Sequence, residues 1–381
     1  MKKEAKQTRE FILGEIFRFL PKSRRKAGDG LPSGRYQFFT SSQQQTKWLD
    51  KADYTENSII LGTGGAASVH HAINFSTSTD VFVLAPANNN VLAKFVYYYL
   101  LGHKNVLERG FKGAGLRHLS RSYVQNLQIP LPVDRKGNPD LAEQERVVVL
   151  LEEVERLKKK RAEANQIIDE IVPALYMGLS KEGDWPKKKI VDVVANKTSV
   201  RTGPFGSQLR HSEFTDEGIP VLGIDNVVTN RFQWAKPRFL PIEKYNKFKR
   251  FRVYPGDVLV TIMGTVGRAC VAPADLPESM STKHLCVITP DHKRVNPVYL
   301  WGSFLYDVNI RHQTKNVAKG AIMEGWNSTI IKNLLISVPP VALQNQFAEK
   351  VKEIEAQKER QKRSMVEIDD LFSSLLYRAF S

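Results

Sequence analysis

Cysteine is nearly absent from this chain of 381 residues, which contains only Cys270 and Cys286. Two cysteines cannot form a disulfide framework, and they lack the CxxC or Cys/His spacing of a structural zinc site. No apolar run approaches the roughly 20 residues that a membrane helix needs. The basic N-terminus contains Glu4, Glu10 and Glu15 and no small-residue cleavage site, so it does not resemble a signal peptide. These absences predict a cytoplasmic protein without a structural metal or a membrane segment.

Signatures of catalysis are also missing. The sequence has no GxxxxGK[ST] phosphate loop and no HExxH metalloprotease motif. Asn296-Pro297-Val298-Tyr299 approaches the Asn/Asp-Pro-Pro-Tyr/Phe motif of adenine methyltransferases, but it lacks the second proline, and no glycine pattern for S-adenosylmethionine accompanies it. We interpret this run as the start of a short apolar helix, and we expect no catalysis from the chain.

One glycine run comes close to the dinucleotide-binding fingerprint. Residues 58–68, SIILGTGGAAS, place Gly-x-Gly-x-x-Ala after an apolar run. A nucleotide site needs a helix directly after the glycines, because the N-terminus of that helix holds the phosphate. The residues that follow here are rich in Val, Ile, Phe and Thr, several in alternation, which favours a second strand. We therefore predict two strands joined by a glycine-rich turn.

The charge balance is strongly basic, although 42% hydrophobic and 25% charged residues are ordinary for a globular protein. The net charge of +16 is typical of a protein with a polyanionic partner, and a surface made basic for solubility alone is the alternative. Residues 143–180 hold six Lys/Arg against eight Asp/Glu, and residues 344–381 hold seven against seven. The segments outside these two therefore carry a net +18, and residues 186–252 alone hold fourteen Lys/Arg against six Asp/Glu.

The sequence repeats itself once. Lys112-Gly113-Ala114 stands twelve residues before Asn126-Leu127, and Lys319-Gly320-Ala321 stands twelve residues before Asn333-Leu334. Each block then runs into a Pro-rich stretch and a long helical segment. The run GDVLVTIMGTVGR in the second half matches the glycine run of the first half. A shared strand–turn–strand element explains both copies, whereas a dinucleotide fingerprint explains at most one.

Two long helices are predicted, at about residues 143–180 and 344–381. Apolar residues recur in alternating steps of four and three, the heptad pattern of helices that pack against one another. At about 1.5 Å per residue, a helix of about 36 residues is roughly 54 Å long. Polar residues interrupt each seam, at Lys158 and Arg161 and at Lys358 and Gln361. The apolar seam residues are Val147, Leu151, Val154, Ile168, Leu175, Phe347, Val351, Ile354, Ile368, Phe372 and Leu375.

Basic and amide side chains gather in the loop-forming segments outside these helices. Arginine suits guanine edges, Asn and Gln suit adenine edges, and Lys and Arg suit phosphates. A solvated loop side chain is the simpler interpretation of any single residue, so the clustering supports the domains and not individual contacts. The candidate DNA-binding residues are Arg24, Arg25, Arg35, Gln43, Gln44, Lys112, Lys197, Arg201, Gln208, Arg210, Asn226, Asn230, Arg231, Lys247, Lys249, Arg250, Arg268 and Lys319.

The duplicated arrangement resembles the specificity subunit of type I restriction–modification systems. The resemblance covers nearly the whole chain, and its specificity comes from the duplication because each motif is short. The first half lacks a counterpart of TGPFGSQL, and its Pro-rich lead into the helix is seven residues longer. The motifs that carry the resemblance are FILGEI, LQIPLP, LAEQERVVVLLEEVERL and PALYMGLS in the first half, and WPKKKIVDVV, TGPFGSQL, EGIPVLGIDNV, GDVLVTIMGTVGR and ISVPP in the second.

This resemblance implies an α+β fold with a pseudo-two-fold internal repeat. Two target-recognition domains would alternate with two long helices that form an antiparallel coiled coil. The expected parts are a first recognition domain over residues 1–140, a first helix over 141–180, a linker over 181–187, a second recognition domain over 188–340 and a second helix over 341–381.

The resemblance also implies a non-catalytic reader of double-stranded DNA. Each domain would read one half of a bipartite target, while the helices set the unread spacer and dock two copies of an adenine methyltransferase subunit. That subunit would bind S-adenosylmethionine and flip the target base. A third subunit, for restriction and translocation, would use ATP and Mg, and this chain would need no cofactor of its own.

Two other interpretations stay open. The chain would be the recognition half of a single-chain restriction enzyme, or a basic coiled-coil scaffold that binds RNA or protein. The polar seam interruptions at Lys158, Arg161, Lys358 and Gln361 carry a further hypothesis, that the helices loosen or accept the methyltransferase there. Solvated polar seam positions are the simpler alternative.

Overall fold

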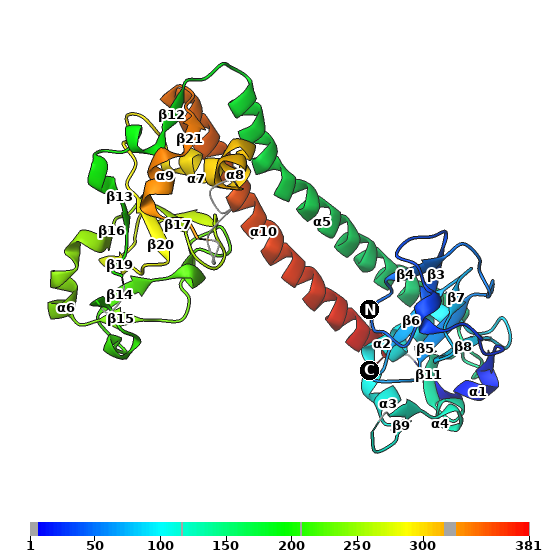
Figure 1. The fold of residues 1–381 in the computed structure, drawn as a ribbon. Helices are drawn as coiled ribbons and strands as arrows, with labels where there is room; N and C mark the ends of the chain where they lie inside the picture. The colour runs from blue at the N-terminus through cyan, green and yellow to red at the C-terminus, as the bar shows by residue number, and fades with distance from the viewer. Residues whose placement is uncertain (1–6, 116, 206–207, 316–324, 381) are drawn as a thin grey trace, which may run out of the picture. The chain divides into compact units, whose positions relative to one another are not determined.

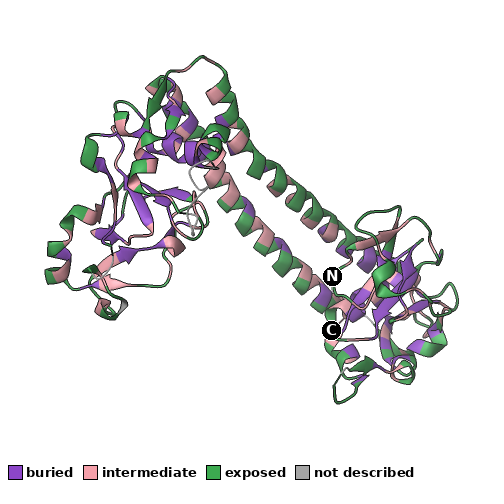
Figure 2. Ribbon diagram, viewed as in Figure 1, coloured by how far each residue is buried: buried purple, intermediate pink, exposed green. Residues whose placement is uncertain are grey.

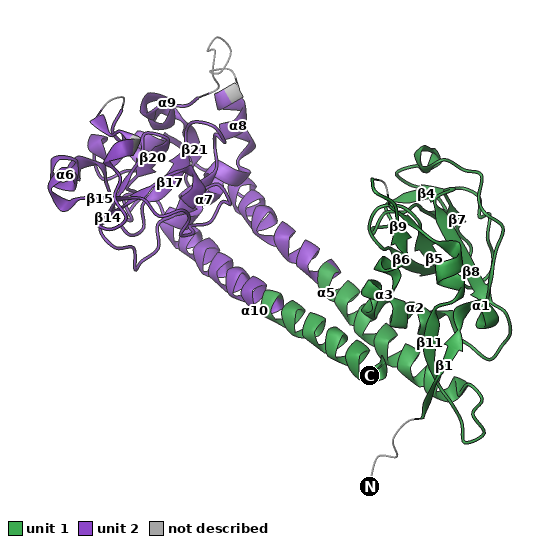
Figure 3. Ribbon diagram, turned by 90° about the horizontal axis from the view of Figure 1, so that it is seen from below, with its two compact units in different colours: residues 1–162, 362–381 green, residues 163–361 purple. Residues whose placement is uncertain are grey.

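The structure, a computed structural model, divides into two compact units, each with its own globular domain and a part of both long helices. The first unit combines Met1–Ala162 with Lys362–Ser381, and the second comprises Glu163–Gln361 (Figures 1 and 3). The first unit is therefore assembled from the two ends of the chain. The residues described are 7–115, 117–205, 208–315 and 325–380.

The two long helices are α5 (Leu141–Lys181) and α10 (Val341–Phe380), close to the ranges that the heptad pattern predicts. Within the first unit the start of α5 packs antiparallel against the end of α10, and within the second unit the end of α5 packs antiparallel against the start of α10. The α+β fold with an internal repeat and a helical coiled coil is thereby confirmed. In the described part of the chain, no helix has the length and hydrophobicity that crossing a membrane requires.

The first domain is built on a four-stranded sheet of order β2-β8-β5-β6 and a three-stranded sheet of order β4-β3-β7. A short antiparallel pair, β1 with β11, joins its beginning to its end. The strands are β1 (Thr8–Ile12), β2 (Phe17–Phe19), β3 (Tyr36–Phe39), β4 (Lys47–Leu49), β5 (Ser58–Gly62), β6 (Val69–Ala72), β7 (Ser76–Thr77), β8 (Val81–Pro86), β9 (Phe111–Lys112), β10 (His118–Leu119) and β11 (Gln128–Pro132). The helices are α1 (Leu13–Ile16), η1 (Ala27–Asp29), α2 (Ala93–Gly102), α3 (Lys104–Glu108) and α4 (Arg121–Gln125).

The second domain has sheets of order β13-β20-β17-β18 and β15-β14-β19-β16, and the pair β12 with β21 joins its beginning to its end. The strands are β12 (Lys187–Lys189), β13 (Val200–Thr202), β14 (Ile219–Leu222), β15 (Phe239–Leu240), β16 (Arg252–Val253), β17 (Val258–Thr261), β18 (Ala269–Val271), β19 (Ser279–Ser281), β20 (Leu285–Ile288) and β21 (Leu335–Ser337). The helices are η2 (Ile190–Asp192), η3 (Lys197–Ser199), η5 (His211–Glu213), η6 (Ile224–Asn226), α6 (Ile242–Lys247), η7 (Lys249–Phe251), α7 (Pro297–Tyr306), α8 (Val308–Lys315) and α9 (Ser328–Asn333).

The internal repeat is visible in the strand order of the two domains. The order β2-β8-β5-β6 corresponds to β13-β20-β17-β18, and β4-β3-β7 corresponds to β15-β14-β19, with β16 added only in the second domain. Each domain also contains one parallel contact, β3 with β7 and β14 with β19, among antiparallel pairs. In sequence the first half shows no TGPFGSQL, and residues 20–35 lie between β2 and β3 as residues 203–218 lie between β13 and β14.

The glycine-rich run is a β-hairpin in both domains. Strand β5 pairs with β6 so that Ile59 lies opposite His71, and β17 pairs with β18 so that Leu259 lies opposite Cys270. Gly65 takes a φ of 80°, a left-handed backbone conformation that suits a turn residue without a Cβ. Strand β6 follows the glycines where a nucleotide fold would place a helix, so the structure confirms the predicted strand–turn–strand element.

Each domain packs its own core against the helix segments of its own unit (Figure 2). In the first unit, α2 buries Phe95 and Val96 in a cluster that includes Leu151 of α5 and Leu376 of α10. In the second unit, α7 buries Tyr299, which packs with Phe347 of α10. Asn296 caps α7 because its side-chain oxygen accepts a hydrogen bond from the Val298 N–H at 2.8 Å, so the Asn-Pro-Val-Tyr run is a helix start.

Candidate nucleic-acid interface

Most of the predicted DNA-binding residues lie on exposed loops and short helices, where a phosphate or a base edge can reach them. Lys319 lies outside the described residues. The exposed candidates are Arg24, Arg35, Gln43, Gln44 and Lys112 in the first domain, and Lys197, Gln208, Arg210, Lys247, Lys249, Arg250 and Arg268 in the second.

A basic segment distinguishes the second domain from the first. Helices α6 and η7 and strand β16 fill the connection from β15 to β17, whereas the equivalent connection from β4 to β5 is much shorter and holds no helix. Aromatic rings alternate with cations here, since Lys244 Nζ lies 5.6 Å from the Phe248 ring centre and Arg250 Cζ lies 4.8 Å from that of Phe251. Lys244 also pairs with Glu213, whereas Lys247, Lys249 and Arg250 are exposed and leave the segment basic at its surface.

Arg201 serves the interior of its domain. Its guanidinium donates to Asp257 at 2.7 Å, to the Arg252 carbonyl oxygen at 2.6 Å and to Thr289 Oγ1 at 2.8 Å. Asp257 is 1% exposed and also accepts from Thr289 Oγ1 at 2.6 Å. Because the guanidinium donors are used within the fold, we assign Arg201 to the domain core, and the sequence-based expectation of a base contact is revised.

Asn226 and Asn230 likewise have structural partners. The Asn226 side chain is 3% exposed, accepts from the Gly223 N–H at 2.9 Å and donates to the Gln233 carbonyl at 3.0 Å. Asn230 has a φ of 64°, in the left-handed region where asparagine is tolerated, and its carbonyl oxygen accepts from Trp301 Nε1 at 3.0 Å. These contacts shape the loop, so an adenine contact by the buried Asn226 side chain is not supported.

Two further candidates are held in ion pairs. Arg25 Nη2 donates to Asp53 Oδ1 at 2.9 Å, and this hydrogen bond holds the pKa of the Asp53 carboxyl below its usual range. Arg231 Nη2 lies 2.5 Å from Glu355 Oε2 of α10, which ties the loop after η6 to the helix. Either arginine would exchange a carboxylate for a DNA phosphate, so each is available only through competition.

The second domain contains a cavity with a mixed apolar and charged lining that the sequence did not predict. It has a volume of about 630 Å³, and its walls combine apolar side chains with charged ones, among them Asp225, Arg238, Lys283 and His284. Burial, with the charges of Lys283 and Arg238, lowers the pKa of His284, which favours the neutral imidazole. These residues come from segments almost sixty positions apart, and no local spacing signals their meeting.

The predicted seam residues face the interior of their units. The eleven predicted seam positions are all buried or half-buried, including Leu151 at 1% and Phe347 at 4% exposure. The buried seam residues are Val147, Leu151, Val154, Ile168, Phe347, Val351 and Ile368, and the half-buried ones are Leu175, Ile354, Phe372 and Leu375.

The polar interruptions of the seam are ion pairs between the helices. Lys158 Nζ lies 2.6 Å from Asp369 Oδ1 in the first unit, and Lys358 Nζ lies 2.7 Å from Asp169 Oδ1 in the second. The two pairs are exact repeats at an offset of 200 residues. Gln361 is 9% exposed, and its side-chain oxygen has no partner among the described residues. The lysines thus fix one helix against the other, which speaks against helices that loosen at these positions.

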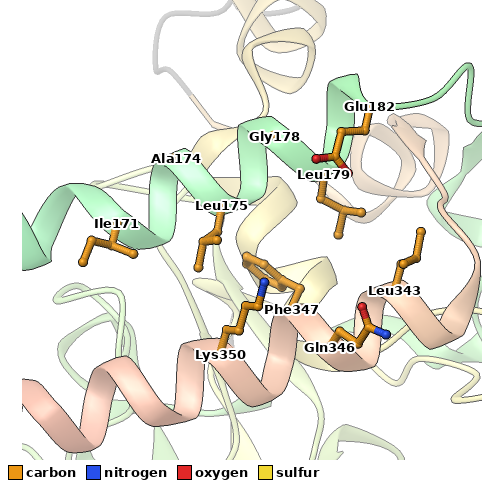
Figure 4. A pocket seen from close by; sticks show the side chains of 10 residues that line it. All are labelled: Ile171, Ala174, Leu175, Gly178, Leu179, Glu182, Leu343, Gln346, Phe347 and Lys350. Carbon is orange, nitrogen blue, oxygen red and sulfur yellow. The ribbon is translucent and has the colours of Figure 1, made fainter.

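An apolar groove lies between the end of α5 and the start of α10 in the second unit (Figure 4). Its volume is about 380 Å³, and Leu175, Leu179 and Phe347 contribute to its walls. Glu182 and Lys350 are the charged residues that line it, and Lys350 extends toward Phe347. In the first unit, the cavity lined by Val147 and Ala379 has a volume of only about 40 Å³.

The family model and the curated relatives that this sequence matches are all type I restriction–modification specificity domains or subunits. The sequence matches the family model of the type I restriction modification DNA specificity domain twice, over residues 6–169 and 182–368. It is 23% identical to the type I restriction enzyme MjaVIII specificity subunit of Methanocaldococcus jannaschii over 226 residues, 54% of this chain and 50% of the relative. It is 21% identical to the EcoBI specificity subunit of Escherichia coli over 322 residues, 75% of this chain and 65% of the relative. The matches therefore span between half and two thirds of these relatives.

Solved structures share the fold. The type I restriction-modification S subunit from M. genitalium superposes with a TM-score of 0.62 at 14% identity, over 100% of this chain and 98% of that chain. A chain from a structure on complex assembly and conformational transition of the type I R-M system gives a TM-score of 0.60 at 18% identity, over 98% and 97% of the two chains.

Proposed function

The chain belongs to the type I restriction modification DNA specificity family, and from this we propose that it is the sequence-reading subunit of a type I restriction–modification complex. Each domain reads one half of a bipartite duplex target. The observation that carries the proposal is the duplication itself, since two domains with corresponding sheets each pack on antiparallel segments of the same two helices. The net charge of +18 outside those helices supports a polyanionic partner.

We propose that the helices bind partner proteins and set the distance between the two domains, and that they do not read bases. Their nearly balanced charge gives little attraction to DNA, whereas the apolar groove beside Leu175 and Phe347 offers a surface to another protein. In this proposal α5 and α10 set the unread spacer and dock two methyltransferase subunits. S-adenosylmethionine, ATP and Mg act in the partner subunits, and this chain contributes no catalytic group.

The decisive experiment maps methylated adenines across the source genome with and without the gene. The expected result is the loss of one motif that consists of two short half-sites around a fixed unread gap. Complementation with the gene on a plasmid restores the motif and controls for secondary mutations. If every methylated motif persists in the deletion strain while the methyltransferase is shown to be expressed, the proposal is wrong.

A binding experiment separates this function from a basic scaffold that binds RNA or protein. The purified complex with the methyltransferase subunit is titrated with duplex DNA, single-stranded RNA and competitor DNA at two or more salt concentrations. A reader binds duplex with a steep salt dependence and retains specific sites in the presence of competitor. Equal affinity for all nucleic acids would favour the scaffold. The similarity to known proteins favours neither the scaffold nor a single-chain enzyme.

A further inference from the structure

The parallel strand pair in each domain directs two loops to the same edge of a sheet. Parallel neighbours have their C-terminal ends at one edge, whereas antiparallel neighbours do not. In the second domain β14 and β19 end at Leu222 and Ser281, and the Thr282 N–H donates to the Leu222 carbonyl at 2.9 Å. In the first domain β3 and β7 end at Phe39 and Thr77, and the Ser78 N–H donates to the Phe39 carbonyl at 2.8 Å.

The edge is therefore a duplicated feature with different side chains. In the second domain the segments that follow these strands are residues 223–226 and 282–284. In the first domain they are residues 40–44 and 78–80. The repeat continues one step further along the chain, since the Ile262 N–H donates to the His284 carbonyl as the Thr63 N–H donates to the Asp80 carbonyl. Thr282, Lys283 and His284 thus correspond to Ser78, Thr79 and Asp80.

In the second domain this edge forms the cavity of about 630 Å³ described above. Arg238 Nη2 donates to Asp225 Oδ1 at 2.5 Å, which orients the guanidinium at the cavity wall. Gly223 makes this approach possible, because a Cβ there would lie 2.5 Å from Arg238 Nη2 and 2.9 Å from Asp225 Oδ1. A side chain at this position would therefore have to push aside the ends of the Arg238 and Asp225 side chains.

Polar atoms at this cavity are left unused by the fold. Arg238 Nε and Thr282 Oγ1 are buried and have no hydrogen-bond partner among the described residues. A buried polar atom without a partner is costly, and a ligand that supplies the partner removes that cost. Lys283 adds a cation and Asp225 an acceptor, while Leu209, Phe214, Ile224 and Val228 supply apolar contact.

This combination of groups matches the edge of a DNA base pair. Arginine and lysine donate to guanine O6 and N7, a carboxylate accepts from the cytosine amino group, and apolar side chains contact the thymine methyl group. A phosphate alone would use the cations but neither Asp225 nor the apolar wall. In the first domain the corresponding loop carries hydroxyls and amides, Ser41, Ser42, Gln43 and Gln44, and its backbone is anchored by His70 Nε2, 2.9 Å from the Ser42 carbonyl oxygen.

We propose that the edge where the parallel strands end is the base-reading site of each domain, with Lys283, beside the Arg238–Asp225 pair, reading a guanine-containing half-site and Gln43 and Gln44 reading an adenine-containing one. This inference rests on the proposed function, because it assigns the reading surface of that same bipartite recognition.

The experiment uses the full-length chain in complex with its methyltransferase subunit and a randomised duplex pool, from which bound molecules are sequenced. Variants are Lys283→Ala in the second domain and Gln43→Ala/Gln44→Ala in the first. Lys283→Ala is expected to relax the preference at one or two positions of the second half-site by about 5- to 150-fold and to leave the first half-site unchanged. The Gln43→Ala/Gln44→Ala variant is expected to do the reverse.

Lys188→Ala is the matched control, since it removes the same charge from the exposed strand β12, which pairs with β21 and lies outside both loops. Co-elution with the methyltransferase and an unchanged melting temperature show that each variant is folded. If Lys283→Ala weakens all sequences equally and lowers the salt slope by about 1, the residue contacts phosphate and the inference is overturned. If the unaltered complex selects no bipartite sequence, the proposed function itself fails, and the two failures are thereby distinguished.

Discussion

The two domains have corresponding four-stranded sheets, but two equivalent positions in them carry different types of side chain. In the second domain Arg201 of β13 and Asp257, which precedes β17, form a buried ion pair. The first domain has Leu20 and Ser58 at the corresponding positions. Leu20 donates its N–H to the Val83 carbonyl, as Arg201 lies opposite Val287, and Ser58 precedes Ile59 as Asp257 precedes Val258. The fold therefore tolerates either solution, which shows that the ion pair is not what specifies the strand order.

The largest effect is expected from breaking this buried ion pair. Asp257→Ser leaves the Arg201 guanidinium buried without its carboxylate and should lower the unfolding free energy of the second unit by about 3–5 kcal/mol. Arg201→Leu/Asp257→Ser, which installs the residues of the first domain, should recover most of that loss. Urea unfolding with hydrogen exchange at β13 and β17 measures both. A double variant as unstable as Asp257→Ser would show that the two solutions are not interchangeable.

A second comparison concerns a buried glutamine at the start of each long helix. Gln144 accepts from the Leu92 N–H at 2.9 Å and donates to the Asn90 carbonyl, whereas Gln344 accepts from the Asn296 N–H at 2.8 Å and donates to the Arg294 and Pro339 carbonyls. Both side chains are 0% exposed. Gln144 therefore fixes the start of α2 to α5, and Gln344 fixes the start of α7 to α10.

Because Gln344 satisfies one more buried group than Gln144, replacement by leucine should cost more in the second unit. We expect a loss of about 3 kcal/mol for Gln344→Leu and about 2 kcal/mol for Gln144→Leu. Hydrogen exchange of α7 and of α2, followed separately, gives the two values and assigns each to its own unit. Equal losses, or a loss spread over both units, would contradict the comparison.

A smaller effect is expected from the repeated ion pairs of the coiled coil. The Lys358 side chain is 16% exposed and the Lys158 side chain is 31% exposed, so solvent screens the charge of Lys358 less well, while the partners Asp169 and Asp369 are 71% and 53% exposed. Double-mutant cycles with Lys358→Met/Asp169→Asn and Lys158→Met/Asp369→Asn should give coupling energies of about 1 and about 0.5 kcal/mol. Lys158 also lies 4.9 Å from the Phe372 ring centre, so Phe372→Leu serves to separate that contribution. Indistinguishable couplings would show that burial does not govern these pairs.

The smallest effect is a difference in acid stability. The Arg25 hydrogen bond lowers the folded-state pKa of Asp53, so the carboxylate stabilises the first unit above its unfolded pKa of about 3.9. That contribution disappears as the pH falls through the lowered folded-state value. Asp53→Asn should therefore flatten the acid limb of the stability profile for the first unit only, as followed by hydrogen exchange of β3 and β7 between pH 5 and 3. A steeper acid limb in the variant would contradict the assignment.

The helices were predictable from sequence to a greater degree than the reading surface. A heptad seam is a local pattern, and the spacing of apolar residues alone predicts that Leu151 and Phe347 are buried. The glycine hairpins and the Asn296 cap are equally local. The parallel contacts of β3 with β7 and β14 with β19 join segments far apart in sequence, and no periodicity marks them.

The same reasoning explains which DNA candidates had to be revised. Arg201 and Asn226 are of the right residue type for base contacts, yet their partners Asp257 and Gln233 decide their role, and a composition argument does not reveal partners. Conversely, Arg238, Lys283 and His284 are unremarkable one at a time. They matter only because the sheet brings residues 223–226 and 282–284 to one edge.

The construction of the first unit from both ends of the chain has a consequence for biosynthesis. Leu376 packs beside Gly102, and Phe380 meets the rings of Phe95 and Tyr99, so the last turns of α10 complete the core around the N-terminal domain. A ribosome that has finished residue 162 must add the whole second unit before those turns emerge. At about 5–20 residues per second this takes on the order of 10–40 s. The domain translated first is therefore completed only after the second unit, and a truncation that removes residues 362–381 damages the core of the domain formed by residues 1–162.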